Sequence, residues 1–230
     1  MVDFKPIYTR LIDHYGPQGW WPLIDRSSEP LRCSYLPEYS TMHLNSAQRF
    51  EICVGAILTQ NTNWSNAEKA LVNLLEAQVL DSQALSEMSV EAIARLIQPS
   101  GYYNQKARKL KIFSQFFLKN PPADRELFLS LWGLGPETVD DMLLYTYNQP
   151  IFVVDLYTKR LFSRLGFVSE SISYHDLQSL ITKGLPKDIL IYKEFHALIV
   201  KNAKVHCSKK PSCMGCPLES LCPASKGFDA

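Results

Sequence analysis

The sequence lacks any run of apolar residues close to the roughly 20 that a membrane-spanning helix requires. It also lacks a surplus of charge, because 24 basic and 23 acidic residues leave a formal net charge of +1. A basic surface for a polyanionic partner must therefore be local. The segment MVDFKPIYTRLIDHYG places acids in an amphipathic pattern, unlike a signal or transit peptide. We expect no membrane partner and a cytoplasmic protein (bacterial or archaeal cytosol), or a nuclear one in a eukaryote.

Strand-like alternation of apolar and polar residues is also scarce, whereas helical periodicity is widespread. Within 46–60, Phe50, Val54 and Ile57 share one face, and Asn45 or Ser46 can cap the start. The other segments with helical periodicity are 66–78, 89–97, 104–117, 124–132, 136–147, 155–164, 173–183 and 187–203. These patterns predict an all-α protein, large enough for one large domain or two small ones.

Cysteine use is uneven, because four of the six cysteines lie in the stretch CSKKPSCMGCPLESLC. Their spacing is C-x5-C-x2-C-x5-C, with prolines and a glycine that supply bends between them. In a reducing compartment such a group indicates a metal site rather than disulfides. Ligand chemistry alone fits a structural zinc ion or a [4Fe–4S] cluster, and the single CxxC favours iron–sulfur. The candidate metal ligands are Cys207, Cys213, Cys216 and Cys222.

Two glycines stand one residue apart in LWGLGPETVD, between the helix-like segments 124–132 and 136–147. The pair is either a plain helix–helix corner or a loop whose open N–H groups admit a phosphate. Pro136 suits the first turn of the second helix, whose positive dipole end would face that phosphate. Asp155 follows four apolar residues and opens the helix 155–164. It is either an ordinary N-cap or a partly desolvated carboxylate that activates water.

Five segments follow one another in a fixed order along the chain: VGAILTQNTNW, GYYNQKA, LWGLGPETVDDMLLY, VVDLYTKRLFSRLG and the four-cysteine stretch. In this order they resemble the helix-hairpin-helix DNA glycosylases of the endonuclease III superfamily, over roughly residues 50–222. The chain is most similar to the branch described as 3-methyladenine DNA glycosylase III or endonuclease III-related proteins. The N-terminal GPQGWWP supports this branch, whose members are understood to build the base pocket with a paired tryptophan and proline.

The resemblance implies two helical lobes. Residues 49–148 would form a six-helix barrel with the helix-hairpin-helix motif at about 124–147, and residues 1–23 and 149–230 would form the lobe that carries the cysteines. Residues 24–48 would be a loop or insertion. The resemblance also implies a [4Fe–4S] cluster, with zinc as the alternative, and a monomer that binds double-stranded DNA with a damaged base. Endonuclease III has a spacer one residue longer between its first two cluster cysteines, a departure that concerns Cys207.

Carried onto this sequence, the family's catalytic aspartate is Asp155, which would stabilise a sugar cation or activate the attacking water. Gln60 matches the residue that fills the gap left by the flipped nucleotide. Aromatic residues and a proline would form the base pocket, because indole faces attract a cationic alkylated purine. Each tryptophan can instead be a core residue. The pocket candidates are Trp20, Trp21, Pro22, Trp64 and Tyr157.

The hairpin backbone would hold a DNA phosphate, and its carbonyls are candidate ligands for an alkali cation. Basic side chains would add phosphate contacts and a salt-dependent affinity, although each can instead belong to a solvated helix face. The predicted DNA-binding residues are Gln60, Lys106, Lys109, Gly133, Leu134, Gly135, Lys159, Arg160, Lys209 and Lys210.

Glu137 stands where endonuclease III has the lysine of its GxGxKT motif, whose amine attacks the sugar. A carboxylate cannot form an imine, so we expect a monofunctional glycosylase that uses water. Glu137 itself is either a helix-start charge favoured by the dipole or a catalytic partner in water activation. The alternatives are a bifunctional endonuclease III-like enzyme for oxidised pyrimidines, a non-catalytic helix-hairpin-helix DNA-binding protein, and a zinc-stabilised helical interaction protein.

Overall fold

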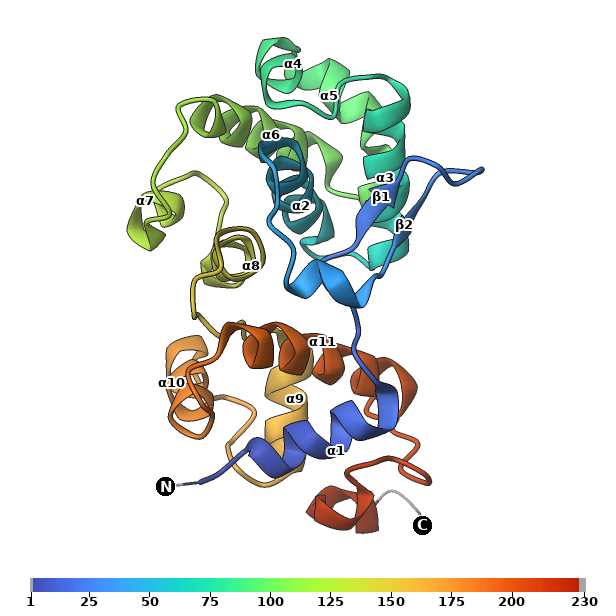
Figure 1. Ribbon diagram of the computed structural model, residues 1–230, viewed down its shortest axis with the longest axis vertical. Coiled ribbons are helices and arrows are strands. Elements are labelled where there is room, and N and C mark those ends of the chain that lie inside the picture. The colour runs from blue at the N-terminus through green and yellow to red at the C-terminus, as the bar shows by residue number, and fades with distance from the viewer. Residues whose placement is uncertain (1, 228–230) are drawn as a thin grey trace. The chain divides into compact units, whose positions relative to one another are not determined.

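The computed structural model describes residues 2–227, and eleven α-helices dominate this part of the chain (Figure 1). The predicted all-α class is confirmed. The chain divides into two compact units, which we call the terminal unit (residues 1–20 and 150–230) and the central unit (residues 21–149). Over the described residues, no helix has the length and apolar character needed to span a membrane.

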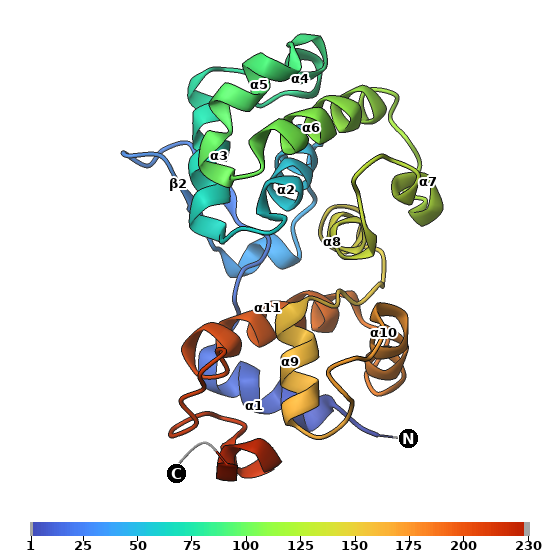
Figure 2. The same ribbon diagram turned by 180° about the vertical axis from the view of Figure 1, so that it is seen from behind.

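The terminal unit joins the two ends of the sequence. Its elements are α1 (Lys5–Tyr15), α9 (Leu156–Arg164), α10 (Tyr174–Lys183), α11 (Ile189–Val205) and the 3-10 turns η3 (Glu219–Leu221) and η4 (Pro223–Gly227). Helix α11 packs against α1 and α9 (Figure 2). The ring of Phe162 lies 5.0 Å from that of Phe4 and 6.4 Å from that of Phe195. This aromatic core fixes the helix that begins at Asp155 against α11.

The central unit is built around one helix. Its elements are β1 (Leu23–Asp25), β2 (Arg32–Ser34), η1 (Pro37–Ser40), α2 (Ser46–Thr59), α3 (Trp64–Glu76), α4 (Ser82–Glu87), α5 (Val90–Leu96), η2 (Gln98–Ser100), α6 (Tyr103–Phe117), α7 (Arg125–Leu129) and α8 (Pro136–Tyr147). Helix α2 packs against α3, α6, α8 and β1, and every residue from Phe50 to Leu58 is buried. The periodicity predicted only one apolar face, but a helix covered on all sides is buried all round.

Several helix starts agree with the sequence signals. Asn45 accepts a hydrogen bond from the backbone N–H of Gln48, and the Gln48 side chain accepts one from Asn45 N–H, which makes a capping box for α2. Ser89 caps α5, and Asp155 caps α9. Local side-chain chemistry therefore sets where each of these helices begins.

Residues 24–48, predicted to be a loop or insertion, contain a short hairpin that belongs to the central unit. Strands β1 and β2 pair antiparallel with Ile24 opposite Cys33. The side chain of Glu51, on α2, accepts a hydrogen bond from Ile24 N–H at 2.6 Å, and Glu68, on α3, accepts one from Cys33 N–H at 2.6 Å. Carboxylates thus tie the strands to the helices, a tertiary contact that local periodicity does not encode. The unit boundary also falls after Trp20, rather than after residue 23.

Candidate functional site

Asp155 lies at the N-terminus of α9, directly after three buried residues of the IFVVD segment. Its side chain is 11% exposed. Oδ1 accepts hydrogen bonds from Thr158 N–H at 2.7 Å and from Thr158 Oγ1 at 2.8 Å. Oδ2 lies 3.5 Å from Nε2 of His196, on α11. Burial favours the neutral acid, but His196 and the two Thr158 hydrogen bonds outweigh it and hold the pKa of Asp155 below its ordinary value.

The N-cap reading of Asp155 is therefore correct, and it does not exclude the catalytic one. One oxygen starts the helix, and the other faces a histidine whose side chain is 4% exposed. Sequence reasoning missed His196. The available signal was the pair of polar residues inside the apolar helix segment EFHALIV.

Trp20 contacts the same histidine. The two rings meet edge-on with centroids 5.6 Å apart, and Trp20 is half-buried. Glu194, two residues before His196 on α11, accepts a hydrogen bond from Gln18 N–H at 2.8 Å. Burial raises the pKa of Glu194, against the hydrogen bonds from Gln18 and Gly19 that lower it. The segment that contains Gly19 and Trp20 is thus fixed on α11. Trp20, His196 and Asp155 form one group within the terminal unit.

Trp21 and Trp64 pack together in the central unit. Their ring centroids are 5.7 Å apart, and Trp21 also meets Tyr145 at 5.4 Å. Gly55 makes room for them, because a Cβ there would lie 3.1 Å from Trp21 Nε1. Trp21 is 6% exposed and Pro22 is buried, whereas Trp64 is half-buried. Trp21 therefore supports the ring of Trp64 from inside the unit.

The hairpin between α7 and α8 needs its first glycine for its own structure. Gly133 has φ +83°, and an added Cβ would overlap the side chain of Lys109. Gly135 is different, because its φ is −102° and a Cβ there would have nothing within 4 Å. Leu134 is buried at 7% exposure. The protein itself therefore accounts for Gly133 but not for Gly135.

Gln60, which ends α2, lies on this hairpin. Its Nε2 donates to Gly133 O at 3.3 Å and to Thr138 Oγ1 at 2.9 Å, and its Oε1 accepts from Lys109 Nζ at 2.5 Å. Burial lowers the pKa of the Lys109 amine. The residue predicted to enter the DNA gap thus shares one hydrogen-bond network with the glycine turn.

The basic residues differ in their access to solvent. Lys106 was predicted to contact DNA, but it is 1% exposed, and its amine donates to Leu58 O and Ser100 O at 2.7 Å each. The prediction that Lys106 contacts DNA is therefore wrong. The apolar stem of Lys106 is buried, and two carbonyls bind its amine inside the unit, where a phosphate cannot reach it. Lys209 and Lys210 are exposed, and Lys159 is half-buried.

Tyr157, one of the predicted pocket residues, is half-buried and lies under the guanidinium of Arg160, which stands 5.6 Å from the ring centroid. Arg160 also donates to Cys207 O at 3.2 Å. The predicted DNA contact Arg160 is therefore engaged within the terminal unit.

Glu137 occupies the first turn of α8 and is exposed. A carboxylate in this turn suits the positive end of the helix dipole. Nearby in the chain, Trp132 is 47% exposed, and the guanidinium of Arg108 lies 4.5 Å from its ring centroid. Trp132 of the hairpin and Arg108 of α6 thus present an aromatic and a cationic group to solvent beside the hairpin backbone.

The four predicted metal ligands all line one pocket of the terminal unit. We call it the cysteine pocket, and its cysteines are Cys207, Cys213, Cys216 and Cys222. Arg164 also lines it and donates a hydrogen bond to Cys207 Sγ at 3.2 Å. Within residues 2–227, no three His, Cys, Asp or Glu side chains close onto a single metal ion.

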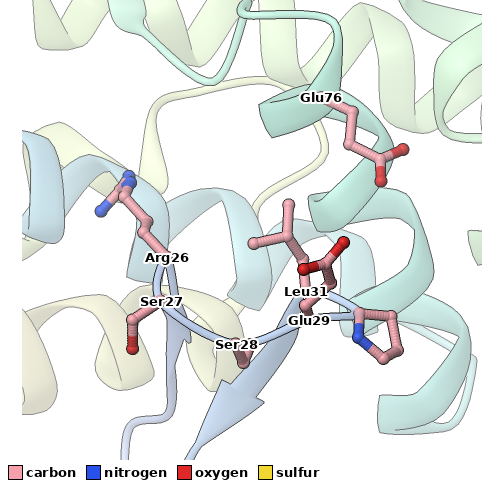
Figure 3. Close-up of a pocket in the computed structure, with 7 residues that line it drawn as sticks. Arg26, Ser27, Ser28, Glu29, Leu31 and Glu76 are labelled. Carbon is pink, nitrogen blue, oxygen red and sulfur yellow. The ribbon is translucent and has the colours of Figure 1, made fainter.

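A larger hollow, of about 650 Å³, lies at the hairpin tip of the central unit. Figure 3 shows Arg26, Ser27 and Ser28 on the turn, with Glu76 of α3 across from them. None of the predicted site residues lines it. Its mixed charges carry no recognisable chemistry, so the candidate functional residues remain the group around Asp155 in the terminal unit and, separately, the glycine hairpin in the central unit.

The chain matches the family described as HhH-GPD superfamily base excision DNA repair protein over residues 54–187. It is 38% identical over 229 residues to a candidate DNA repair glycosylase of Methanocaldococcus jannaschii. That alignment covers 94% of this chain and 94% of the relative.

Two solved structures share the fold. The H. pylori 3-methyladenine DNA glycosylase MagIII, bound to 1,N6-ethenoadenine, has a TM-score of 0.67 at 24% identity and covers 88% of this chain and 98% of its own. A non-covalent endonuclease III–DNA complex has a TM-score of 0.78 at 20% identity and covers 99% of this chain and 98% of its own. At these identities the likeness shows the fold alone.

Proposed function

The chain belongs to the HhH-GPD superfamily of base excision DNA repair proteins and is a DNA N-glycosylase, and we propose that it releases a damaged base from double-stranded DNA by hydrolysis, without a covalent enzyme–DNA intermediate. The preferred base in this proposal is a cationic alkylated purine such as 3-methyladenine. The observation that carries it is Asp155, a buried carboxylate held in its ionised form by Thr158 and His196.

A carboxylate alone suffices for this substrate. When the N-glycosidic bond breaks, the bonding electrons leave with the base, and a cationic purine departs as a neutral molecule that needs no proton donor. Positive charge develops on the sugar, where an ionised carboxylate stabilises it. Water then adds to the sugar carbon and gives its proton to the carboxylate.

The two oxygens of Asp155 have separate tasks in this mechanism. Oδ1 is fixed by two hydrogen bonds from Thr158. Oδ2 stands 3.5 Å from His196, longer than a strong charge-assisted hydrogen bond of about 2.8 Å. We therefore assign the reactive role to Oδ2, with His196 as a positioning residue.

A half-buried tryptophan, Trp20 in the terminal unit or Trp64 in the central unit, would stack on the base, because an indole face attracts a cation by roughly 0.5–2 kcal/mol. Trp20 is held beside Asp155 through His196, and Trp64 is backed by Trp21. Pro22, which follows Trp21, and Tyr157, two residues after Asp155, are further candidates for contacts to the base. The MagIII structure was solved with 1,N6-ethenoadenine, a modified purine base, which supports a purine for a protein of this fold.

Contacts to DNA in this proposal come from the hairpin, from half-buried Lys159 and from two exposed lysines. Gly135 supports a phosphate contact at the hairpin. Neither its backbone conformation nor its surroundings require a glycine, and the missing side chain would allow a DNA phosphate to approach the N–H groups at the N-terminus of α8. The Gly133 carbonyl, which accepts from Gln60, is the candidate ligand for an alkali cation. Gln60 would fill the gap left by the flipped nucleotide, and Lys159, Lys209 and Lys210 would neutralise phosphates.

The cysteine pocket fits a [4Fe–4S] cluster by its donor set. Four cysteines would ligate it as thiolates, and no cysteine in the described chain forms a disulfide. When bound, the cluster would pin the C-terminal loop and present Lys209 and Lys210. Iron and acid-labile sulfide analysis, with absorption near 400 nm, tests it; zinc in place of iron would support the alternative metal.

Release of free base from alkylated, deaminated and oxidised duplexes, measured by mass spectrometry, tests the function. We expect release of 3-methyladenine or 7-methylguanine. Asp155→Asn should abolish release while keeping binding to an abasic-site analogue, since asparagine also caps a helix. Asp81→Asn, at the N-cap of α4, is the matched control and should release base at the wild-type rate. Retained release by Asp155→Asn would remove Asp155 from its role.

Borohydride treatment during turnover tests the monofunctional mechanism. Glu137 supplies no amine at the hairpin, so no cross-linked enzyme–DNA species should form. A trapped adduct would support the bifunctional alternative. Its loss in Lys159→Ala or Lys109→Ala would identify the lysine that replaces the missing amine.

A further inference from the structure

Asn202 is a buried polar residue that the catalytic mechanism does not use. It lies in the last full turn of α11 and has no exposed surface. Its backbone carbonyl accepts hydrogen bonds from His206 N–H at 2.8 Å and Cys207 N–H at 2.9 Å. Asn202 therefore ends the helix and places the first cysteine of the pocket.

The two ends of the Asn202 amide have different surroundings. Oδ1 accepts a hydrogen bond from the hydroxyl of Tyr15, on α1, at 2.9 Å, and it lies 3.6 Å from Cys216 Sγ. Nδ2 is buried and has no hydrogen-bond partner among the described residues. A buried N–H group without an acceptor is unfavourable, and such exceptions call for a ligand or another acceptor.

The cysteine pocket supplies that acceptor. Asn202 lines the pocket together with all four cysteines. Tyr15 donates to Oδ1, which leaves Nδ2 as the end of the amide without a partner in the described part of the chain. A cluster bound by the four cysteines of the pocket would offer Nδ2 sulfur acceptors.

Resting on the iron–sulfur cluster proposed above, we propose that Asn202 Nδ2 donates a hydrogen bond to a sulfur of that cluster, with Tyr15 as the residue that orients the amide. The sulfur is either a cysteine thiolate or a sulfide. Hydrogen bonds to cluster sulfurs stabilise the negative charge added on reduction, so this one raises the reduction potential. It also slows loss of the cluster, as partners of metal ligands do.

Four variants of the full-length, cluster-loaded chain test the inference. Asn202→Asp keeps an oxygen for Tyr15 and replaces the N–H donor by an acceptor, whereas Asn202→Leu removes both groups at similar volume. Tyr15→Phe removes only the orienting hydroxyl and leaves Asn202 in place. Asn73→Leu is the matched control, because Asn73 donates to Leu96 O in the central unit and has no contact with the cysteine pocket.

The readouts are the midpoint potential on an electrode and the half-time of absorbance loss near 400 nm in air. We expect a lower potential and about tenfold faster cluster loss in both Asn202 variants. Tyr15→Phe should shift both quantities in the same direction by less, which tests the inference even where an Asn202 variant does not fold. Asn73→Leu should match the wild type.

Two results overturn the inference. A wild-type potential and a wild-type cluster lifetime in iron-loaded Asn202→Asp or Tyr15→Phe would contradict the N–H···S hydrogen bond and leave the cluster proposal intact. A purified chain that contains neither iron nor sulfide would contradict both the cluster proposal and the hydrogen bond that rests on it. Base release is measured separately and decides the glycosylase proposal in either case.

Discussion

At the residue scale, the Asp155 side chain caps α9, and in the proposed mechanism the same carboxylate also acts on the sugar. Its folded pKa lies below the ordinary carboxyl value because His196 and Thr158 stabilise the charge more than burial opposes it. The ionised side chain therefore stabilises the fold at pH values above 3.8, and this contribution is lost as the pH falls through the lower folded pKa.

This pKa predicts a pH-dependent difference between the wild type and Asp155→Asn. Both residues cap α9, so the two proteins differ chiefly in the charge. The wild type should be the more stable protein at pH 7, and the difference in free energy of unfolding should shrink as the pH falls below 3.8. Urea unfolding from pH 2 to pH 7 measures it. A difference that stays constant across this range would contradict the pKa assignment.

The two hairpin glycines predict opposite behaviour on substitution. Gly133→Ala should cost at least about 1 kcal/mol of stability, because its φ is positive and its Cβ overlaps Lys109. Gly135→Ala should change stability by less than about 0.5 kcal/mol. It should nevertheless weaken DNA binding about tenfold, as expected for one lost phosphate hydrogen bond. Thermal unfolding and fluorescence anisotropy with duplex DNA measure the two effects, and equal stability losses would contradict the distinction.

At the element scale, periodicity and caps predicted where the described helices lie except for α1 and α4, since both signals are local. The start of α2 at Ser46, after the Asn45 cap, and that of α9 after Asp155 follow from side chains within four positions. The β1–β2 hairpin was not predicted, because buried Glu51 and half-buried Glu68, which belong to other elements, hold it through hydrogen bonds. The prediction that Lys106 contacts DNA was wrong for the same reason, since only the folded chain shows the carbonyls that bind its amine.

The hairpin's attachment predicts a local effect of Glu51→Ala. Removing this carboxylate leaves the Ile24 N–H without its acceptor, so stability should fall by roughly 2 kcal/mol. The Ile24 amide should exchange its hydrogen faster, while amides of α5 keep their rates. Glu87→Ala, at an exposed position of α4, is the control and should leave both quantities near wild type. Unchanged exchange at Ile24 would show that strand pairing alone holds β1.

At the scale of the whole molecule, a formal charge of +1 leaves little long-range attraction to DNA. Affinity must then come from few, well-placed phosphate contacts. The exposed Lys209 and Lys210 stand on a loop whose carbonyl at Lys209 accepts from Arg164 at 3.2 Å, so the loop is held by the helix α9.

These contacts predict the salt dependence of binding. Lys209→Ala and Lys210→Ala should each reduce the slope of log affinity against log salt concentration by about 1, and they should weaken binding equally for damaged and undamaged duplexes. Lys5→Ala, at an exposed position of α1, should leave the slope unchanged. Anisotropy titrations over a range of salt concentrations measure it. A slope unaffected by the loop lysines would place the DNA elsewhere.

The cap geometry of Asp155 has an evolutionary consequence. Aspartate and asparagine codons differ by a single nucleotide, and asparagine starts a helix as well as aspartate does. Under the proposed mechanism, one point mutation therefore yields a protein that folds normally, binds damaged DNA and does not excise the base. Such a protein would occupy lesions and shield them from other repair enzymes. Cells that carry it alongside the normal copy should consequently tolerate alkylating agents less well than cells that simply lack one copy.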